Sequence, residues 1–246
     1  MKVLSDLPPI SKSLLCQIAF EGSVEKLELA LEGFTDHHNN LIALDSNGRN
    51  TLHWASLSGN VNMLRFLVQK HKIPINCKDG LGWTPLMIAV SAGRHQAALF
   101  LIDSGASISQ TNNNGQTALH FAVSKNRSEL VNELLNNVDN QETVVNTSDV
   151  FGVSALHRAV SVASKEIVRR LVDAGASAEI KDTEGNTALH LAALEGKIEV
   201  IQLLIHNNSD LLRTRNKEGK LPFDLASNPD IRRQLIPPPS KEDTQD

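Results

Sequence analysis

Apolar residues recur at helical spacing in stretches that are separated by short polar segments. Two examples are IEVIQLLI from residue 198 and EIVRRLVDAG from residue 166. In both, the apolar positions fall on one face of a helix, which predicts amphipathic helices. Each stretch follows a short turn and an earlier, smaller apolar phrase, such as ALHLA from residue 188. The pattern therefore predicts pairs of helices, with a second helix packed against a first one that contains alanine.

One phrase marks the start of each pair and recurs along the chain. It reads GRNTLHWA from Gly48, GWTPLMIA from Gly82, GQTALHFA from Gly115, GVSALHRA from Gly152, GNTALHLA from Gly185 and GKLPFDLA from Gly219. The glycines are 34, 33, 37, 33 and 34 residues apart. This period and phrase resemble the ankyrin repeat, in which one unit cannot bury its apolar face without its neighbours.

The expected fold is therefore an all-α repeat solenoid, elongated and curved, of seven ankyrin repeats with β-hairpin-like loops between helix pairs. Residues 11–32 and 221–236 lack parts of the phrase and are expected to cap the ends of the stack, as terminal repeats do. We expect residues 1–10 to form an N-terminal arm, residues 11–236 a single domain and residues 237–246 a proline-rich, disordered tail.

The 37-residue spacing marks a four-residue insertion within residues 136–150. Insertions in repeat proteins fall in loops, often on the binding side. A tolerated surface loop is the simpler interpretation, and it is the one that the sequence favours.

Charge and composition exclude several classes of function. There are 24 Lys and Arg against 28 Asp and Glu, a net charge of −4, which argues against nucleic acid as the main partner. The chain contains no run of 18 apolar residues, so no membrane span is expected. The start of the sequence does not resemble a secretory signal. Two cysteines do not make a disulfide framework.

Histidine and cysteine also give no catalytic or metal-binding pattern. His53, His120, His157 and His190 hold the same place in successive repeats, about 10 Å apart along a stack, which is too far for one metal ion. We expect them to hydrogen-bond backbone between a helix start and a neighbouring hairpin. No nucleophile and base can be paired, so we expect a protein that is not an enzyme and needs no cofactor.

What remains is a protein-binding surface, which ankyrin domains form from hairpin tips and the ends of first helices. Trp83 and Phe151 stand at variable tip positions, where large rings are favoured as interface anchors. Packing between neighbouring hairpins is the competing interpretation for both. Trp54 replaces a framework residue, and core packing is favoured there.

Four longer sequence segments resemble the gankyrin family. The segments are DSNGRNTLHWA from residue 45, GLGWTPLMIAVSAGR from 80, AVSKNRSELV from 122 and KDTEGNTALHLA from 181. They occur in the family's order over about residues 14–230.

This resemblance implies a chaperone for assembly of the 26S proteasome regulatory particle base. Such proteins bind the C-terminal domain of one proteasomal ATPase subunit through a concave face, with basic residues against acidic ones. The partner-binding candidates in this sequence are Arg49, Trp83, Arg94, Lys125, Arg127, Phe151, Glu184 and Glu195. We expect Arg49 and Lys125 to be exposed.

The chain departs from the family at Leu191–Glu195, because Ala193 stands where animal gankyrin has the cysteine of its retinoblastoma-binding motif. An adaptor or inhibitor of a cell-cycle kinase or a transcription factor is the alternative function. The resemblance implies a monomer in the cytoplasm and nucleus, with neither nucleic acid nor membrane as a partner.

Overall fold

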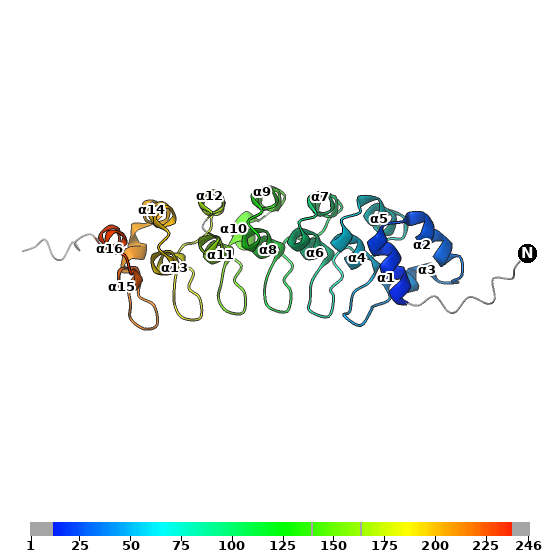
Figure 1. The fold of residues 1–246 in the computed structure, drawn as a ribbon, viewed down its shortest axis with the longest axis horizontal. Helices are drawn as coiled ribbons and strands as arrows, with labels where there is room; N and C mark the ends of the chain where they lie inside the picture. The colour runs from blue at the N-terminus through cyan, green and yellow to red at the C-terminus, as the bar shows by residue number, and fades with distance from the viewer. Residues whose placement is uncertain (1–11, 139, 163, 238–246) are drawn as a thin grey trace, which may run out of the picture. The chain divides into compact units, whose positions relative to one another are not determined.

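The computed structural model describes residues 12–138, 140–162 and 164–237, which form two compact units that divide after Phe121. The expected N-terminal arm and all of the expected tail beyond Pro237 lie outside the described residues. In the described parts of the chain there are seven helix pairs and no β-sheet, apart from an isolated bridge between Ser148 and Ser154. The expected all-α repeat fold is confirmed (Figure 1).

The first unit contains three helix pairs and two shorter elements. Its helices are α1 Lys12–Glu21, α2 Val24–Leu31, α3 His37–Ile42, α4 Thr51–Ser58, α5 Val61–Arg65, α6 Pro85–Ala92 and α7 His95–Asp103. A π-helical turn, η2 Phe66–Lys70, continues α5. Helix α8, Ala118–Ser124, crosses the division between the units.

The second unit continues the pairs. Its helices are α9 Ser128–Asn136, α10 Gln141–Val145, α11 Ala155–Ser161, α12 Lys165–Asp173, α13 Ala188–Glu195, α14 Ile198–Asn207, α15 Pro222–Leu225 and α16 Pro229–Gln234, with a 3-10 turn, η3 Ser209–Arg213. In each unit the first helix of a pair lies between its hairpin loop and the second helix (Figure 1).

The core is built from the leucine and alanine of the repeated phrase. Leu52 and Ala55 of α4, and Leu189 and Ala192 of α13, have no exposed surface. The small alanines let successive first helices approach closely, while the second helices cover them from the outer side. No helix in the described ranges is long and apolar enough to cross a membrane.

The insertion forms more than a surface loop. Residues 141–145 form α10, which begins after Asn140, whose side chain accepts a hydrogen bond from the Thr143 backbone N–H at 3.1 Å. Val144 and Val145 of this helix are buried. The interpretation as a tolerated surface loop is therefore wrong for this part, because two apolar side chains of the insertion join the core.

Candidate binding surface

An aspartate or asparagine begins each hairpin loop, three residues before the glycine of the phrase. In the loop of Asp149, its Oδ1 accepts hydrogen bonds from the backbone N–H groups of Phe151 at 2.9 Å and Val153 at 3.0 Å. The equivalent residues, which make the same pair of bonds, are Asp45, Asp79, Asn112, Asp182 and Asn216. The sequence reasoning missed this feature, although the recurrence of Asp or Asn at a fixed distance from glycine was visible.

Backbone hydrogen bonds hold neighbouring tips together within each unit. In the first unit, the Gly80 N–H donates to the Asn47 carbonyl at 2.9 Å, and the Asn113 N–H donates to the Leu81 carbonyl at 3.1 Å. In the second unit, the Thr183 N–H donates to the Phe151 carbonyl at 2.9 Å. The tips of each unit are thus presented at fixed spacing on a rigid edge, which favours binding without large rearrangement.

Close packing between hairpins also explains why the repeated phrase begins with glycine. At Gly152 φ is +72°, and a Cβ atom would lie 2.8 Å from the Lys181 carbonyl oxygen and 2.9 Å from the Asp182 Cα. Any side chain there would therefore clash with the neighbouring backbone in a conformation that already favours glycine.

Three of the four repeated histidines connect their first helix to the next hairpin, as expected from the sequence. His157 Nδ1 accepts from the Ser154 backbone N–H at 3.3 Å, while Nε2–H donates to the Asn186 carbonyl at 3.1 Å. His53 and His190 make the equivalent bonds to the carbonyls of Trp83 and Lys220, both at 3.2 Å. Both ring nitrogens are therefore engaged, and the bonds require a neutral ring.

We expect the protein to lose stability as the pH falls below about 6.5. Burial lowers the pKa of His53, His157 and His190 below the ordinary value. Below about pH 6.5 these histidines are protonated in the unfolded chain but stay neutral in the folded chain. Their contribution to the free energy of unfolding is therefore complete above the pKa of the unfolded state. Below it, each histidine contributes a loss of up to about 1.4 kcal/mol per pH unit.

Urea unfolding midpoints at pH 7.5, 6.5 and 5.5 would measure this dependence. The variant His190→Gln, which does not titrate, should show a shallower decline than the wild type. An unfolding free energy that stays constant between pH 7.5 and 5.5 would contradict the assignment.

Among the candidate residues of the first unit, Arg49 is not a freely exposed cation. Its side chain is 26% exposed, and its Nε donates to Asp79 Oδ2 at 3.0 Å, with the Asp79 side chain only 1% exposed. Its guanidinium also lies over the Trp54 ring, 5.8 Å from the centroid. The expectation that Arg49 is exposed is wrong, because this arginine neutralises a buried carboxylate that begins the next hairpin.

Trp83 and Arg94 also make contacts within the first unit. The Trp83 ring is half-buried and stacks on Phe121 of helix α8, with centroids 4.1 Å apart, so it packs on a first helix rather than on a neighbouring hairpin. Arg94 is exposed, and its Nε donates to the Leu57 carbonyl at 2.9 Å. At the tip of the hairpin that contains Trp83, Leu81 is 64% exposed.

Trp54 is half-buried rather than part of the core. Its Nε1–H donates to Asp45 Oδ2 at 2.9 Å, and its ring meets Phe20 edge-on at 6.1 Å. These three side chains, with Cys16 and Gln17, line a hollow of about 240 Å³ that the sequence did not indicate.

In the second unit, Lys125 is exposed as expected, and Arg127 is half-buried. Phe151 is 61% exposed at the hairpin tip, the position that Leu81 holds in the first unit. Val150 beside it is 57% exposed. Each unit thus presents an exposed apolar side chain at a tip, and such side chains are common anchors for protein partners.

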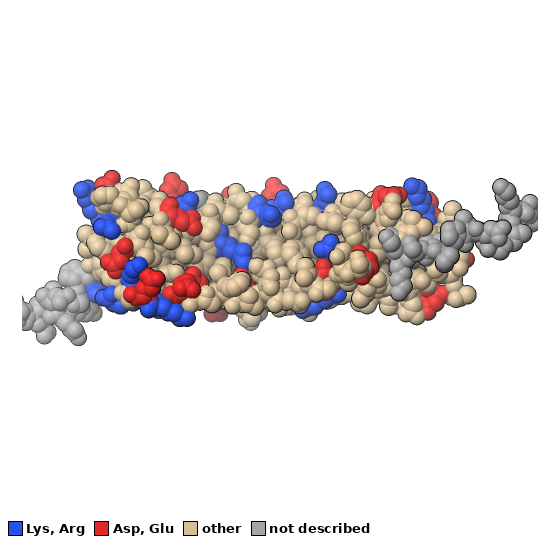
Figure 2. Space-filling model, turned by 60° about the horizontal axis from the view of Figure 1, so that its bottom comes forward, with Lys and Arg blue, Asp and Glu red and all other residues tan. Residues whose placement is uncertain are grey.

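The two acidic candidates of this unit, Glu184 and Glu195, are also exposed. Glu195 lies 3.7 Å from Lys197 Nζ and accepts from the Ser161 hydroxyl at 3.3 Å. Figure 2 shows acidic and basic side chains mixed over the C-terminal repeats of the second unit. The charge there is mixed rather than uniformly basic.

The sequence did not predict a role for Arg158, which pairs with the aspartate of its own hairpin. Its Nη2 donates to Asp149 Oδ2 at 2.6 Å and its Nη1 donates to the Ser124 hydroxyl at 3.3 Å. Although burial raises the pKa of Asp149, the N–H groups of Phe151 and Val153, together with Arg158, hold that pKa below its ordinary value. Trp54 makes the same type of bond to Asp45 from the same place in the phrase. The other four phrases have an apolar residue there, so the sequence does not mark this position.

The cysteines are poor nucleophiles. Burial raises the pKa of the Cys16 thiol to about 12 and that of Cys77 to about 11, so both are protonated at neutral pH. Within the described residues, no group of three or more His, Cys, Asp or Glu side chains is arranged to hold a metal ion. The arrangement of exposed tips on a rigid edge is suited to binding another protein.

Known proteins resemble this chain over most of its length. It is 34% identical to an ankyrin repeat-containing protein of Schizosaccharomyces pombe over 62% of the chain and 80% of that protein. It is 30% identical to the probable 26S proteasome regulatory subunit p28 of Saccharomyces cerevisiae over 80% of the chain and 86% of that protein. The chain spans a quarter or less of the length of some other curated relatives, including two named as transferases.

A solved structure supports the fold. The crystal structure of the ankyrin repeat domain of Bcl-3 matches with a TM-score of 0.78 and 23% identity, over 94% of this chain and 98% of that one. The family model for ankyrin repeats in three copies matches residues 71–149, 108–182, 139–215 and 156–243, and a second ankyrin-repeat model matches residues 35–89. The chain therefore belongs to the ankyrin-repeat family.

Proposed function

We propose that this protein is a non-catalytic chaperone of the gankyrin type, which binds the C-terminal domain of one proteasomal ATPase subunit during assembly of the regulatory particle base. The observation that carries the proposal is the similarity to the proteasome regulatory subunit p28, which extends over 86% of that relative. A relationship over nearly the whole length is expected when two proteins present the same sequence of binding repeats.

The exposed side chains support an acidic protein partner. Arg94 in the first unit and Lys125 in the second are exposed cations in the turns between the two helices of a pair, and Leu81 and Phe151 are exposed apolar side chains at the hairpin tips. Apolar side chains supply most of the affinity at such surfaces, whereas charges set orientation and association rate. Arg49 contributes by holding its hairpin in place, and its charge is shared with Asp79.

The non-catalytic part of the proposal rests on the state of the reactive groups. Both thiols have raised pKa values, and His53, His157 and His190 use both ring nitrogens in structural hydrogen bonds. A general base needs a free nitrogen within reach of a substrate.

Changing Lys125 to Glu and Phe151 to Ser together is expected to abolish capture of proteasomal ATPase subunits by the tagged chain. The double variant reverses an exposed charge and removes an exposed ring, so its melting temperature should stay close to that of the wild type. Capture from a yeast extract, followed by mass spectrometry, measures the effect.

Lys72→Glu is the matched control, because it makes the same charge change at an exposed residue after η2, away from the hairpin tips. It should capture as the wild type does. If the double variant still captures ATPase subunits, the surface that carries Lys125 and Phe151 is not the binding site. If the wild type instead enriches a kinase or a transcription factor, the alternative function of an adaptor or inhibitor takes its place.

A further inference from the structure

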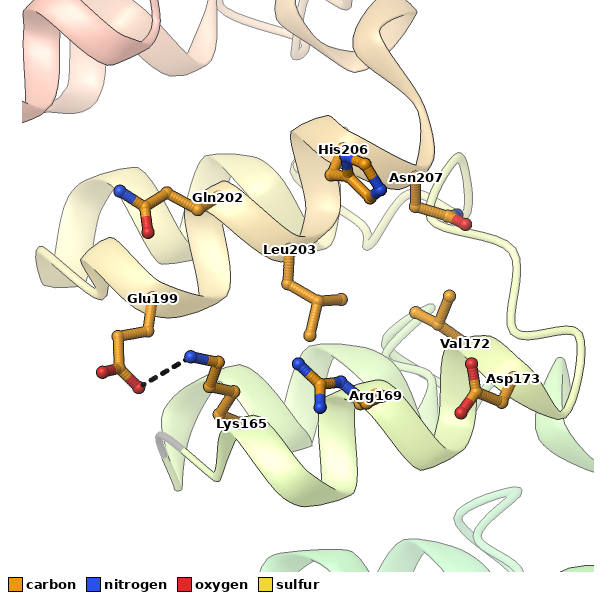
Figure 3. A pocket seen from close by; sticks show the side chains of 9 residues that line it. All are labelled: Lys165, Arg169, Val172, Asp173, Glu199, Gln202, Leu203, His206 and Asn207. Atoms are coloured by element: carbon orange, nitrogen blue, oxygen red, sulfur yellow. Dashed lines mark ion pairs between the residues drawn. The ribbon is translucent and has the colours of Figure 1, made fainter.

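A second surface lies on the outer side of the second unit, away from the hairpin tips. Helices α12 and α14 lie side by side there and enclose a hollow of about 560 Å³ (Figure 3). This volume falls within the range of roughly 300–1,000 Å³ that ligand sites occupy. At one end the hollow is bounded by an ion pair, with Lys165 Nζ 3.6 Å from Glu199 Oε2.

Arg169 lies in the middle of this hollow and points toward Leu203 across it (Figure 3). It is exposed, and it forms no hydrogen bond or ion pair with the part of the chain that the structure describes. The residues opposite it on α14 are Gln202 and Leu203, neither of which carries a negative charge.

The neighbouring arginine on the same helix is in a different state. Arg170 Nε donates to Asn132 Oδ1 at 3.0 Å, and its Nη2 donates to Asn136 Oδ1 at 2.5 Å. Both acceptors belong to α9. One guanidinium of α12 is therefore bound within the protein, while the other is available to a ligand.

The surroundings of Arg169 favour a single carboxylate over a phosphate group. A guanidinium binds one carboxylate through two parallel hydrogen bonds. A phosphate carries more charge and would meet the carboxylates of Asp173 and Glu199, which line the same hollow. Val172 and Leu203 are half-buried and add an apolar floor beside the arginine.

We propose that this hollow binds an acidic segment of a partner protein, in which a carboxylate side chain meets Arg169 and a following aliphatic side chain lies on Val172 and Leu203. The Lys165–Glu199 ion pair bounds one end of the hollow, so the segment lies between this pair and Asn207 at the other end (Figure 3). The Asp173 carboxylate, one helical turn from Arg169, accepts hydrogen bonds from backbone N–H groups of that segment. This surface is separate from the tip surface and does not depend on the proteasomal function.

The test is an NMR titration of the ¹⁵N-labelled full chain with the peptide Gly-Ser-Asp-Leu-Ser-Gly at millimolar concentration. The Nε–H resonance of Arg169 is expected to move and saturate, while that of Arg170, held by two asparagines, stays in place. The peptide Gly-Ser-Asn-Leu-Ser-Gly is the matched control and should leave both resonances unmoved. Arg169→Ala should weaken binding about tenfold or more, measured on the backbone resonances of α14, whereas Lys217→Ala, which removes an exposed cation on a hairpin, should not.

Three results would overturn the proposal. The first is equal movement of Arg169 and Arg170, which would indicate non-specific attraction. The second is no saturable change with the aspartate peptide. The third is movement of the Arg169 resonance without peptide when Glu242, Asp243 and Asp246 are changed to Gln, Asn and Asn, since the chain's own acidic end would then be the occupant.

Discussion

Replacing Asp149 by Ala is expected to lower the free energy of unfolding by about 3–5 kcal/mol, because it leaves a partly buried arginine without its partner. Asp149 is 6% exposed and accepts three hydrogen bonds, two from the backbone of its own hairpin and one from Arg158. The substitution removes the ion pair and the turn-forming acceptors together. Urea unfolding followed by circular dichroism measures the change.

Asp149→Asn separates the two contributions. An asparagine already begins the hairpins at Asn112 and Asn216, where its Oδ1 accepts the same two backbone N–H groups. The asparagine variant should therefore keep the turn and lose only the charge pair, with a smaller destabilisation than the alanine variant. Equal stability of the wild type and Asp149→Ala would show that the pair contributes nothing to the fold.

Leu156→Ala and Leu189→Ala are each expected to cost about 2–5 kcal/mol, as other buried leucines do. The two side chains are 1% and 0% exposed, at equivalent positions of α11 and α13. Each loses its transfer free energy and leaves a cavity between neighbouring repeats.

Leu194→Ala is the matched control for these two variants. Leu194 lies on the same helix as Leu189 but is 57% exposed, so its truncation should change stability by less than about 0.5 kcal/mol. Thermal unfolding of the three purified variants measures the difference. A Leu189→Ala melting temperature equal to that of Leu194→Ala would place Leu189 outside the core.

The repeat fold could be predicted from the sequence because its determinants are local and recur. The leucine and alanine of the phrase, the histidine that directly follows the leucine in four repeats and the glycine with positive φ belong to short segments whose roles repeat. His157 illustrates this, since both of its hydrogen bonds follow from its place in the phrase. Because the same phrase recurs six times at nearly constant spacing, a chance match to the ankyrin repeat was implausible.

The state of individual surface residues could not be predicted in the same way. Arg49 stands at a tip position that varies between repeats, and its burial depends on Asp79, which is 30 residues away in the next hairpin. Trp83 is likewise half-buried because Phe121 lies against it. These contacts join variable positions of neighbouring repeats, and one sequence does not reveal which variable side chains meet.

The insertion shows a related limit. Its residues 141–145 have no counterpart in the other repeats, so comparison between repeats predicted only extra length. The burial of Val144 and Val145 results from the space beneath α9 and its neighbours, which the packed structure defines. Asn146 adds to this by donating to the Gly175 carbonyl at 3.0 Å.

The most direct test of the central claim is calorimetric titration of the purified chain with the purified C-terminal domain of each proteasomal ATPase subunit, at low and at high salt. The account predicts that one domain binds with one-to-one stoichiometry, more weakly as salt screens the exposed charges, and that Lys125→Glu weakens this binding while Lys72→Glu does not. Absence of binding to every domain, or binding that Lys125→Glu leaves unchanged, would contradict it.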